Sequence, residues 1–447
     1  MNPIRDALNA WFASANAYIL MPAIGAALLA LVPIGRRAAA YIAMLVALTS
    51  AGGVLGVAYR FDAGKGLQHA TDKAWIPAVG ARYHVAIDGL SLAMMAVTAL
   101  VLACAIGYAL WDERGGRTRG YFALMLLLEA ALMLLFTARD LLLFYVGFEA
   151  MLIPLYFLVA VWGGPGRRAA TLKFVLYTVI GTLLMLVGMI WLALQVDGGP
   201  SFAYADVAGK GNTWVFLAFV VAFAIKSPIW PFHGWVGDAY RQAPPEVAAV
   251  LSGVASKAGA YGLLAIVLPI FPSQLQDWRW VLIALGTVGL LYGSLLAFRQ
   301  PDGRGVIAYS SIGQMGLITL GIALATQRGA TGATLQMVNH ALVSASREGR
   351  PESRFIRLLP SKIANWLLRR VTGCTIRDMG GFKCLRGDVV ARVPGQREAQ
   401  KRAALGHGKA GAQRDAGQQR QRRAPPVIVA RDDRRVVARG AQQGGVA

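Results

Sequence analysis

Four ionisable side chains lie inside stretches of the sequence that are otherwise apolar and long enough to cross a lipid bilayer. Two of them are lysines. Lys226 follows the apolar run from Trp214 to Ile225, and Lys257 lies near the middle of the run from Pro244 to Pro269. A lysine at mid-membrane costs about 2.5 to 17 kcal/mol, depending on the scale, and such a cost is normally tolerated for an ion or proton path. The alternative is a structural lysine that a carboxylate neutralises or that reaches the membrane interface.

The other two are carboxylates. Glu129 interrupts the run YFALMLLLEAALMLLF, and Glu149 lies in LLLFYVGFEAMLIPLYFLVAVWGG. Burial favours the neutral form of a lysine or a glutamate, whereas a nearby opposite charge restores the ionised form. A change in the distance between a buried lysine and a buried glutamate therefore moves a proton. A permanently closed salt bridge is the alternative interpretation.

A helix break is expected directly after the first lysine. Pro228 and Pro231 follow Lys226, and a proline removes an amide donor and clashes with the carbonyl four residues before it. Freed backbone groups in hydrocarbon are tolerated only where protein or trapped water satisfies them. The two prolines therefore predict a hydrated cavity inside a helix bundle, with His233 and Trp235 at the break.

The composition is that of a polytopic membrane protein. The 447 residues are 56% hydrophobic and only 15% charged, whereas about a quarter of the residues are charged in soluble proteins. Residues 347–447 hold 23 Lys/Arg and 8 Asp/Glu, so most of the net charge of +22 belongs to the C-terminal segment. No nucleic acid is expected as a partner. Cys104, Cys374 and Cys384 show no metal-site spacing and no disulfide framework.

Apolar runs of spanning length predict an all-α protein with ten or eleven transmembrane helices, the first of them a retained span rather than a signal peptide. The runs are 17–35, 38–60, 84–110, 120–138, 140–162, 170–195, 213–236, 244–270, 278–298 and 305–325, and an eleventh starts near 331. Arginine pairs gather in alternate short loops, which places the N-terminus outside and the C-terminal segment in the cytoplasm.

Several of these stretches resemble one family. They are LLLFYVGFEAMLIPLYFLVAVWGGPGRRAATLKFVLYTVIGTLLML, FAIKSPIWPFHGWVGDAYRQAP, SKAGAYGLL, VIAYSSIGQMG and MVNHALVSAS. Together they resemble the M subunit of the membrane arm of respiratory complex I, a proton-translocating NADH:quinone oxidoreductase, over residues 1–346. That family is similar to the subunits of Mrp-type sodium/proton antiporters, which remain the alternative function of another class.

The resemblance implies a fold of two inverted five-helix repeats and a role for each buried charge. Glu149 would pair with Lys226 on the broken helix, and Lys257 would be the central relay lysine. The supporting positions that the resemblance implies are Glu129, His233, Trp235 and His340, with Pro228 and Pro231 at the helix break. The sequence departs from the family at Gln314, Gly237 and Tyr240, which affects the fine tuning of the relay.

The resemblance also implies the setting. This chain carries no redox centre of its own, and NADH, flavin, iron–sulfur clusters and quinone are expected on other subunits. The partners are the other membrane-arm subunits and the lipid bilayer. The expected location is the inner, cytoplasmic membrane of a bacterium.

The sequence after Ser346 no longer follows the family. Residues 358–392 resemble a fragment of a family-2 glycosyltransferase of the dolichol-phosphate mannosyltransferase type, without that family's nucleotide-binding half. From Pro394 onward the composition predicts disorder. An RNA-binding arm and a patch for anionic lipid are the functional alternatives for this basic tail.

The predicted organisation has five parts. These are N-terminal transmembrane helices (1–118), a first five-helix repeat (119–270), an incomplete second repeat (271–346), the glycosyltransferase-like fragment (347–393) and a disordered basic tail (394–447). We expect the second repeat to be truncated, so that the exit half of a proton path is missing and the chain as written does not pump protons. A non-functional product of a fused or frameshifted gene is a further alternative.

Overall fold

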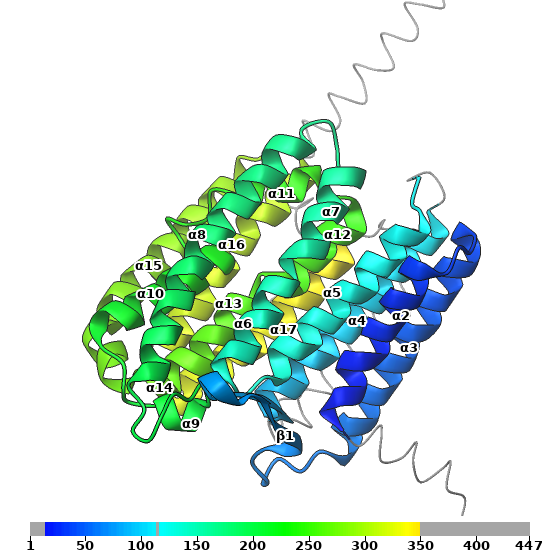
Figure 1. The fold of residues 1–447 in the computed structure, drawn as a ribbon. Helices are drawn as coiled ribbons and strands as arrows, with labels where there is room; N and C mark the ends of the chain where they lie inside the picture. Colours follow the sequence, from blue (N-terminus) through cyan, green and yellow to red (C-terminus); the bar gives the residue numbers. More distant parts are fainter. Residues whose placement is uncertain (1–13, 113–115, 349–447) are drawn as a thin grey trace, which may run out of the picture. The chain divides into compact units, whose positions relative to one another are not determined.

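A computed structural model describes residues 14–112 and 116–348, and these residues form a bundle of long helices (Figure 1). In this part of the chain, eight helices are long and apolar enough to cross a membrane, and α2 and α10 are shorter apolar helices. With α17 they account for the ten or eleven spans that the sequence predicts. The fold class, a polytopic helical membrane protein, is therefore confirmed.

The helices follow the predicted runs closely. Their bounds are α2 (Ala15–Leu31), α3 (Arg36–Arg60), α4 (Gly89–Trp111), α5 (Arg119–Thr137), α6 (Leu141–Ala150), α7 (Leu152–Trp162), α8 (Arg167–Leu194), α9 (Tyr204–Val207), α10 (Thr213–Lys226), α11 (Val236–Gln242), α12 (Pro245–Val250), α13 (Lys257–Gly262), α14 (Leu268–Ile270), α15 (Pro272–Phe298), α16 (Gly303–Ala323) and α17 (Gln327–Glu348). Two π-helical segments, η3 (Leu251–Ala255) and η4 (Leu263–Val267), join α12, α13 and α14 into one span. Likewise α6 and α7 form one span.

The expectation of a purely helical chain is wrong in one place. The segment between α3 and α4 forms an antiparallel hairpin of β1 (Gln68–Ile76) and β2 (Ala81–Ile87), joined by the 3₁₀ turn η1 (Pro77–Val79). The predicted span 84–110 therefore starts too early, because its first residues belong to β2. Helix α4 begins only where the Asp88 side chain accepts a hydrogen bond from Ser91 N at 2.7 Å.

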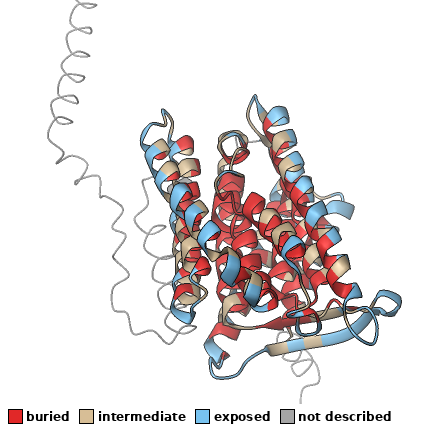
Figure 2. Ribbon diagram, turned by 90° about the vertical axis from the view of Figure 1, so that its left-hand side faces the viewer, coloured by how far each residue is buried: buried red, intermediate tan, exposed pale blue. Residues whose placement is uncertain are grey.

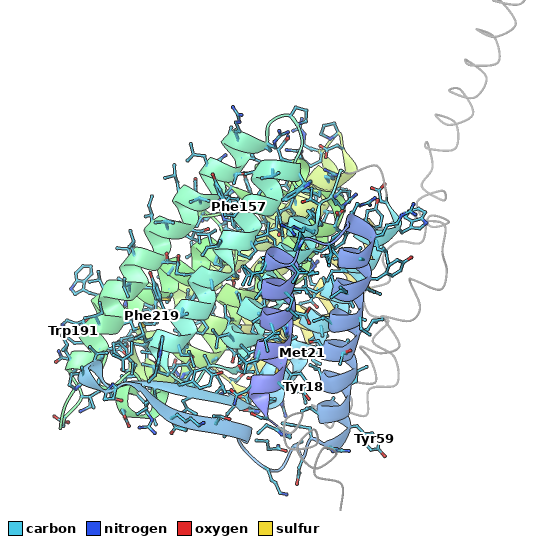
Figure 3. The ribbon with its side chains drawn as sticks, turned by 45° about the vertical axis from the view of Figure 1, so that its right-hand side comes forward. Tyr18, Met21, Tyr59, Phe157, Trp191 and Phe219 are labelled. Carbon is cyan, nitrogen blue, oxygen red and sulfur yellow. The ribbon has the colours of Figure 1, made fainter. Side chains whose placement is uncertain are left out.

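The two ends of the bundle are distinct. We call the end with β1 and β2 the hairpin end, where Arg139 N donates to His84 O and Gly209 N donates to Ile270 O. The opposite end, here the arginine end, carries the loops near Arg36, Arg117 and Arg167. Tyr18 of α2 and Tyr59 of α3 lie near the hairpin end, and Phe157 of α7 lies toward the arginine end (Figure 3).

Charged groups on the surface stabilise both ends. On the hairpin, the Arg82 guanidinium donates to Asp72 at 2.7 Å and lowers the pKa of that carboxyl. At the arginine end, Asp302 accepts from Gly305 N at 2.7 Å and thereby caps α16, and this bond lowers the pKa of Asp302. Asp302 also accepts from Arg241 at 2.9 Å, which ties α16 to the end of α11.

The span that carries Lys257 lies at the centre of the bundle. Of its most apolar stretch 94% is buried, against 22% for α15, whose outer face is open to lipid or to partner subunits. Figure 2 shows buried residues on the inner faces of the helices and exposed residues on the outer faces and the hairpin. A charge on the central span is therefore shielded from lipid by the surrounding helices.

Helix α10 and α11 are separated by the predicted break. Helix α10 ends at Lys226, and the chain becomes helical again only at Val236. Within the break, Ile229 N donates to Ala224 O at 2.9 Å, and the indole of Trp235 donates to Ile225 O at 2.9 Å. Protein groups thus satisfy the carbonyls that the prolines free, as a membrane interior requires.

Helix α10 packs very closely against α13. A methyl group at Gly259 would overlap Phe223 O and Ser227 Oγ, and one at Gly262 would overlap the Phe223 ring. Only glycine allows the two helix backbones to approach this closely, as is common between transmembrane helices.

We predict that Gly259→Ala destabilises the bundle by about 1–3 kcal/mol, because the added methyl group forces α13 away from α10. The thermal unfolding midpoint in detergent, followed by tryptophan fluorescence, should fall. Gly56→Ala is the matched control, since a methyl group there meets no atom within 4 Å. An equal midpoint for the two variants would contradict the close contact.

A second prediction concerns the break. Trp235→Phe leaves the buried carbonyl of Ile225 without its donor, which costs about 1–3 kcal/mol. Amide exchange of residues 224–236 should accelerate, whereas Trp214→Phe, at a side chain 79% exposed, should leave exchange unchanged. Identical exchange in both variants would show that Trp235 does not hold the break together.

Candidate functional site

Lys226 is a buried charge at the end of a helix. The residue is 2% exposed, and its Nζ atom has no hydrogen-bond partner among residues 14–112 and 116–348. The ammonium lies 5.3 Å from the centre of the Phe148 ring and 5.5 Å from that of Phe174. The negative faces of aromatic rings stabilise a cation, so α6 and α8 provide Lys226 with part of the solvation that water would give.

Glu149 lies one residue after Phe148 on α6. Its charge acts on Lys226, yet the two side chains form no direct hydrogen bond or salt bridge. The Oε1 atom of Glu149 is buried without a hydrogen-bond partner, although the residue as a whole is half-buried. The expected contact pair is thus an open pair in this structure, with α6 and α10 as the elements that hold it.

Lys257 is fully buried, but its surroundings differ from those of Lys226. Its ammonium donates to Ser252 O and, at 3.2 Å, to Ser256 Oγ. Ser252 belongs to the π-helical segment η3, and such a segment often occurs at functional sites because it loosens the regular backbone pattern. The carbonyl that Lys257 binds therefore lies in the π-helical turn η3.

One hydrogen bond joins the segments of the two lysines. Ser227, the residue after Lys226, donates from Oγ to the carbonyl of Ser256, the residue before Lys257, at 3.0 Å. The close packing at Gly259 brings the two helices together at the same level. Lys226 and Lys257 therefore belong to one continuous buried region at mid-bundle.

The remaining acidic position, Glu129, lies on α5. It is fully buried, and neither carboxyl oxygen has a hydrogen-bond partner. The Ser50 hydroxyl of α3 lies near the Glu129 carboxyl, but the two groups do not form a hydrogen bond of normal geometry. Glu129 is thus a further buried carboxyl, on a helix next to α6.

The predicted histidines lie at two different places. His233 lies in the break, and its ring packs edge-on against Tyr292 with centroids 4.9 Å apart. Its Nδ1 atom is buried without a hydrogen-bond partner, and the charge of Lys173 acts on it. His340 is 6% exposed on α17 and lies 3.3 Å from Ser344 Oγ. Helix α17 packs against η3 and α12, on the span of Lys257.

The positions that depart from the family pattern take part in ordinary packing. Gln314 makes a short hydrogen bond with Gln336 across α16 and α17. Tyr240 is fully buried and packs edge-on against Trp235. A side chain at Gly237 would contact the hydroxyl of Tyr309.

A buried ionic cluster at the arginine end was not predicted from the sequence. Arg117 donates from Nε to Glu246 at 2.6 Å, and the Tyr121 hydroxyl donates to the same carboxylate oxygen at 2.6 Å. Burial alone would lower the pKa of Arg117, but the bond to Glu246 more than offsets it and raises the pKa above its ordinary value. The only sequence signal is an acid directly after two prolines, at the start of the span that carries Lys257.

Metal binding has no support in the described ranges. Within residues 14–112 and 116–348, no group of three or more His, Cys, Asp or Glu side chains could hold a metal ion. The chemistry that these residues can perform is proton transfer between buried carboxyl, ammonium and imidazole groups.

Comparison with known proteins identifies relatives of this chain. The profile of the family described as "NADH:quinone oxidoreductase/Mrp antiporter, TM" matches residues 138–347. The chain is 36% identical to NADH-quinone oxidoreductase subunit M of Rhodobacter capsulatus, over 73% of this chain and 67% of that protein. It is 34% identical to subunit M of Mycobacterium tuberculosis (strain ATCC 25618 / H37Rv), over 81% of this chain and 71% of that protein. Against subunit M of Rickettsia prowazekii the identity is 34%, over 68% and 63% respectively.

Solved structures agree with these relatives. A chain of respiratory complex I from Thermus thermophilus superimposes with a TM-score of 0.67 at 30% identity, over 78% of this chain and 71% of that chain. A chain of the Mrp complex from Dietzia sp. DQ12-45-1b has a TM-score of 0.63 at 22% identity and shows the shared fold alone.

The relatives are longer than the part that matches. The chain spans between 63% and 71% of the length of the curated subunits M named above. The glycosyltransferase-like fragment at 358–392 and the tail at 394–447 lie outside the described residues and remain predictions. Over the rest, the sequence identity and the fold agree: the chain belongs to the family of NADH-quinone oxidoreductase subunit M.

Proposed function

We propose that this chain is a proton-translocating subunit of the membrane arm of a respiratory NADH:quinone oxidoreductase, in which Glu149, Lys226 and Lys257 carry the proton. We set aside the expectation, from the sequence, that the chain as written does not pump protons. The observation that carries this proposal is the hydrogen bond between Ser227 and Ser256. It joins the segments of Lys226 and Lys257, and both lysines are buried in the middle of the bundle. Membrane subunits keep such charges where ions or protons pass.

Protons reach Lys226 from the arginine end. At that surface, Lys173 and Asp238 form an ion pair of 2.8 Å, and both side chains are largely exposed. His233 lies deeper, in the break, and Gly234 beside it leaves room for the Tyr177 hydroxyl. The freed backbone of residues 227–235 is the region that a membrane interior tolerates only where protein or water solvates it.

Glu149 controls whether Lys226 keeps its proton. When the carboxylate approaches, the ammonium form of Lys226 is stabilised, and when it moves away, burial favours release. The open arrangement in this structure corresponds to the releasing state. The proton then passes through Lys257 toward His340, whose helix α17 packs against η3.

The energy for these steps comes from other subunits. Quinone reduction there changes the charge and hydration of the membrane arm, and NADH, flavin, iron–sulfur clusters and quinone bind to those subunits. The partners of this chain are therefore neighbouring membrane-arm subunits and lipid, and the largely exposed outer face of α15 offers an apolar surface to both.

The location that we propose is the inner membrane of a bacterium. The arginine end faces the cytoplasm, because short loops rich in Lys and Arg remain on that side. The N-terminus and the hairpin end then face outward.

We predict that Lys226→Met abolishes NADH-driven proton uptake. In inverted vesicles that contain the assembled complex, the initial rate of acidification should fall by about a hundredfold or more, the lower end of the range for the loss of one proton-transferring group. Lys65→Met is the control, since that lysine is exposed in the hairpin loop. The assay is run without sodium, so uptake by the wild type that requires sodium would favour the antiporter alternative. Normal uptake in Lys226→Met would contradict the relay.

A further prediction tests the link between the lysines. Ser227→Ala removes the hydrogen bond to Ser256 and should lower the number of protons taken up per electron, while quinone reduction continues. Ser273→Ala is the matched control, because the exposed Ser273 lies in the first turn of α15 and donates to its neighbour Gln274. An unchanged number of protons taken up per electron in Ser227→Ala would show that the relay does not depend on this hydrogen bond.

A further inference from the structure

A second polar cluster lies between Lys257 and the surface of the hairpin end. Tyr261 is one helical turn after Lys257, on the same face of α13, and its hydroxyl lies 3.2 Å from Ser91 Oγ. The Arg139 guanidinium donates to the same Ser91 oxygen at 2.8 Å. From there it reaches Asp88 at 2.8 Å, where the carboxylate is 34% exposed. The cluster therefore lies between the helix that carries Lys257 and the outer surface.

The hydrogen bonds of this cluster all run in one direction. Tyr261 donates its only hydroxyl proton to Phe136 O at 2.7 Å, so Ser91 donates to Tyr261. Arg139 donates to Ser91, and a guanidinium accepts no hydrogen bond and does not lose its proton. The chain of donors thus starts at a permanent cation and ends at a backbone carbonyl. Between Tyr261 and the Asp88 carboxylate, the guanidinium offers a proton no acceptor.

Arg139 is held firmly in this position. The residue is 8% exposed and lies in the short segment between α5 and α6, whose backbone forms hydrogen bonds to two other elements. Arg139 N donates to His84 O at 2.8 Å, and Tyr204 N donates to Arg139 O at 3.4 Å. The backbone is thereby fixed between β2 and α9. Among the described residues, the Nε atom of Arg139 is buried without a hydrogen-bond partner, while the guanidinium pairs with Asp88 through Nη2.

We propose that Arg139 is the electrostatic barrier that closes Lys257 off from the hairpin-end surface and so sets the direction in which the relay releases its proton. A fixed cation in a narrow polar path repels protons and other cations, as in other selective membrane pores. The Asp88 carboxylate positions the guanidinium, and Ser91 and Tyr261 occupy the path below it. Arg139 acts on the relay through its field and is a positioning residue. The proposal rests on the relay proposed above.

The test is the passive proton leak of vesicles that contain the assembled complex, measured as the decay of an imposed pH gradient without NADH. Arg139→Gln removes the charge and keeps a donor for Ser91, so the decay should accelerate several-fold. Arg139→Lys retains a cation and should restore the tight state. Arg82→Gln is the control at the same end, since Arg82 forms an exposed pair with Asp72.

A second variant tests the role of the arginine charge without replacing the arginine. Ser91→Asp places a second carboxylate, besides that of Asp88, against the guanidinium, so the leak should again increase, whereas Ser91→Asn should not increase it. Assembly is verified through the NADH:quinone reductase rate of each sample. Leak rates equal to the wild type in both Arg139→Gln and Ser91→Asp would overturn the proposal.

The leak and the relay can fail separately. If Lys226→Met leaves pumping intact while Arg139→Gln leaks, the barrier holds and the relay assignment is wrong. If Lys226→Met abolishes pumping while both Arg139→Gln and Ser91→Asp remain tight, the relay holds and the barrier is wrong.

Discussion

The structure depends on the inability of hydrocarbon to hydrogen-bond a peptide group. Two prolines stop α10 in the middle of the bundle, and the carbonyls that they free must find donors inside the protein. Trp235 provides one through its indole, and the backbone amide of Ile229 provides another. Because the break is closed by protein in this way, Lys226 can end a helix at mid-depth rather than at the membrane surface.

The two buried lysines are stabilised by different groups, and this difference is compatible with a proton relay. Lys226 lies against the rings of Phe148 and Phe174, and the charge of Glu149 acts on it. Lys257 instead binds a carbonyl and a hydroxyl of its own span, where the π-helical turn η3 lies. Lys226, on which a charge from another helix acts, thus lies near Lys257, which is solvated by groups of its own span. The contact between Ser227 and Ser256 keeps them in register.

Local sequence signals predicted the parts of the fold that local chemistry decides. The apolar runs located the spans, and Pro228 and Pro231 located the break, since both effects act within a few residues. The hairpin between α3 and α4 was missed because β1 is largely exposed and the end of β2 was read as the start of the next apolar run. The Arg117–Glu246 pair and the contact of Ser91 with Tyr261 join residues 129 and 170 positions apart. Such contacts depend on helix packing, which no short motif records. The burial of Glu129, Lys226 and Lys257 was predictable, whereas the half-buried position of Glu149 and its open arrangement with Lys226 were not.

The central claim is that Glu149 and Lys226 act as one proton-binding unit although they do not touch in this structure. A double-mutant cycle tests it most directly, with Glu149→Gln, Lys226→Met and the double variant compared for proton uptake per electron in the assembled complex. Residues that act as a unit give non-additive losses. The account predicts that the double variant is no worse than the worse single variant. Losses that add in free energy would contradict it, because the two side chains would then act independently.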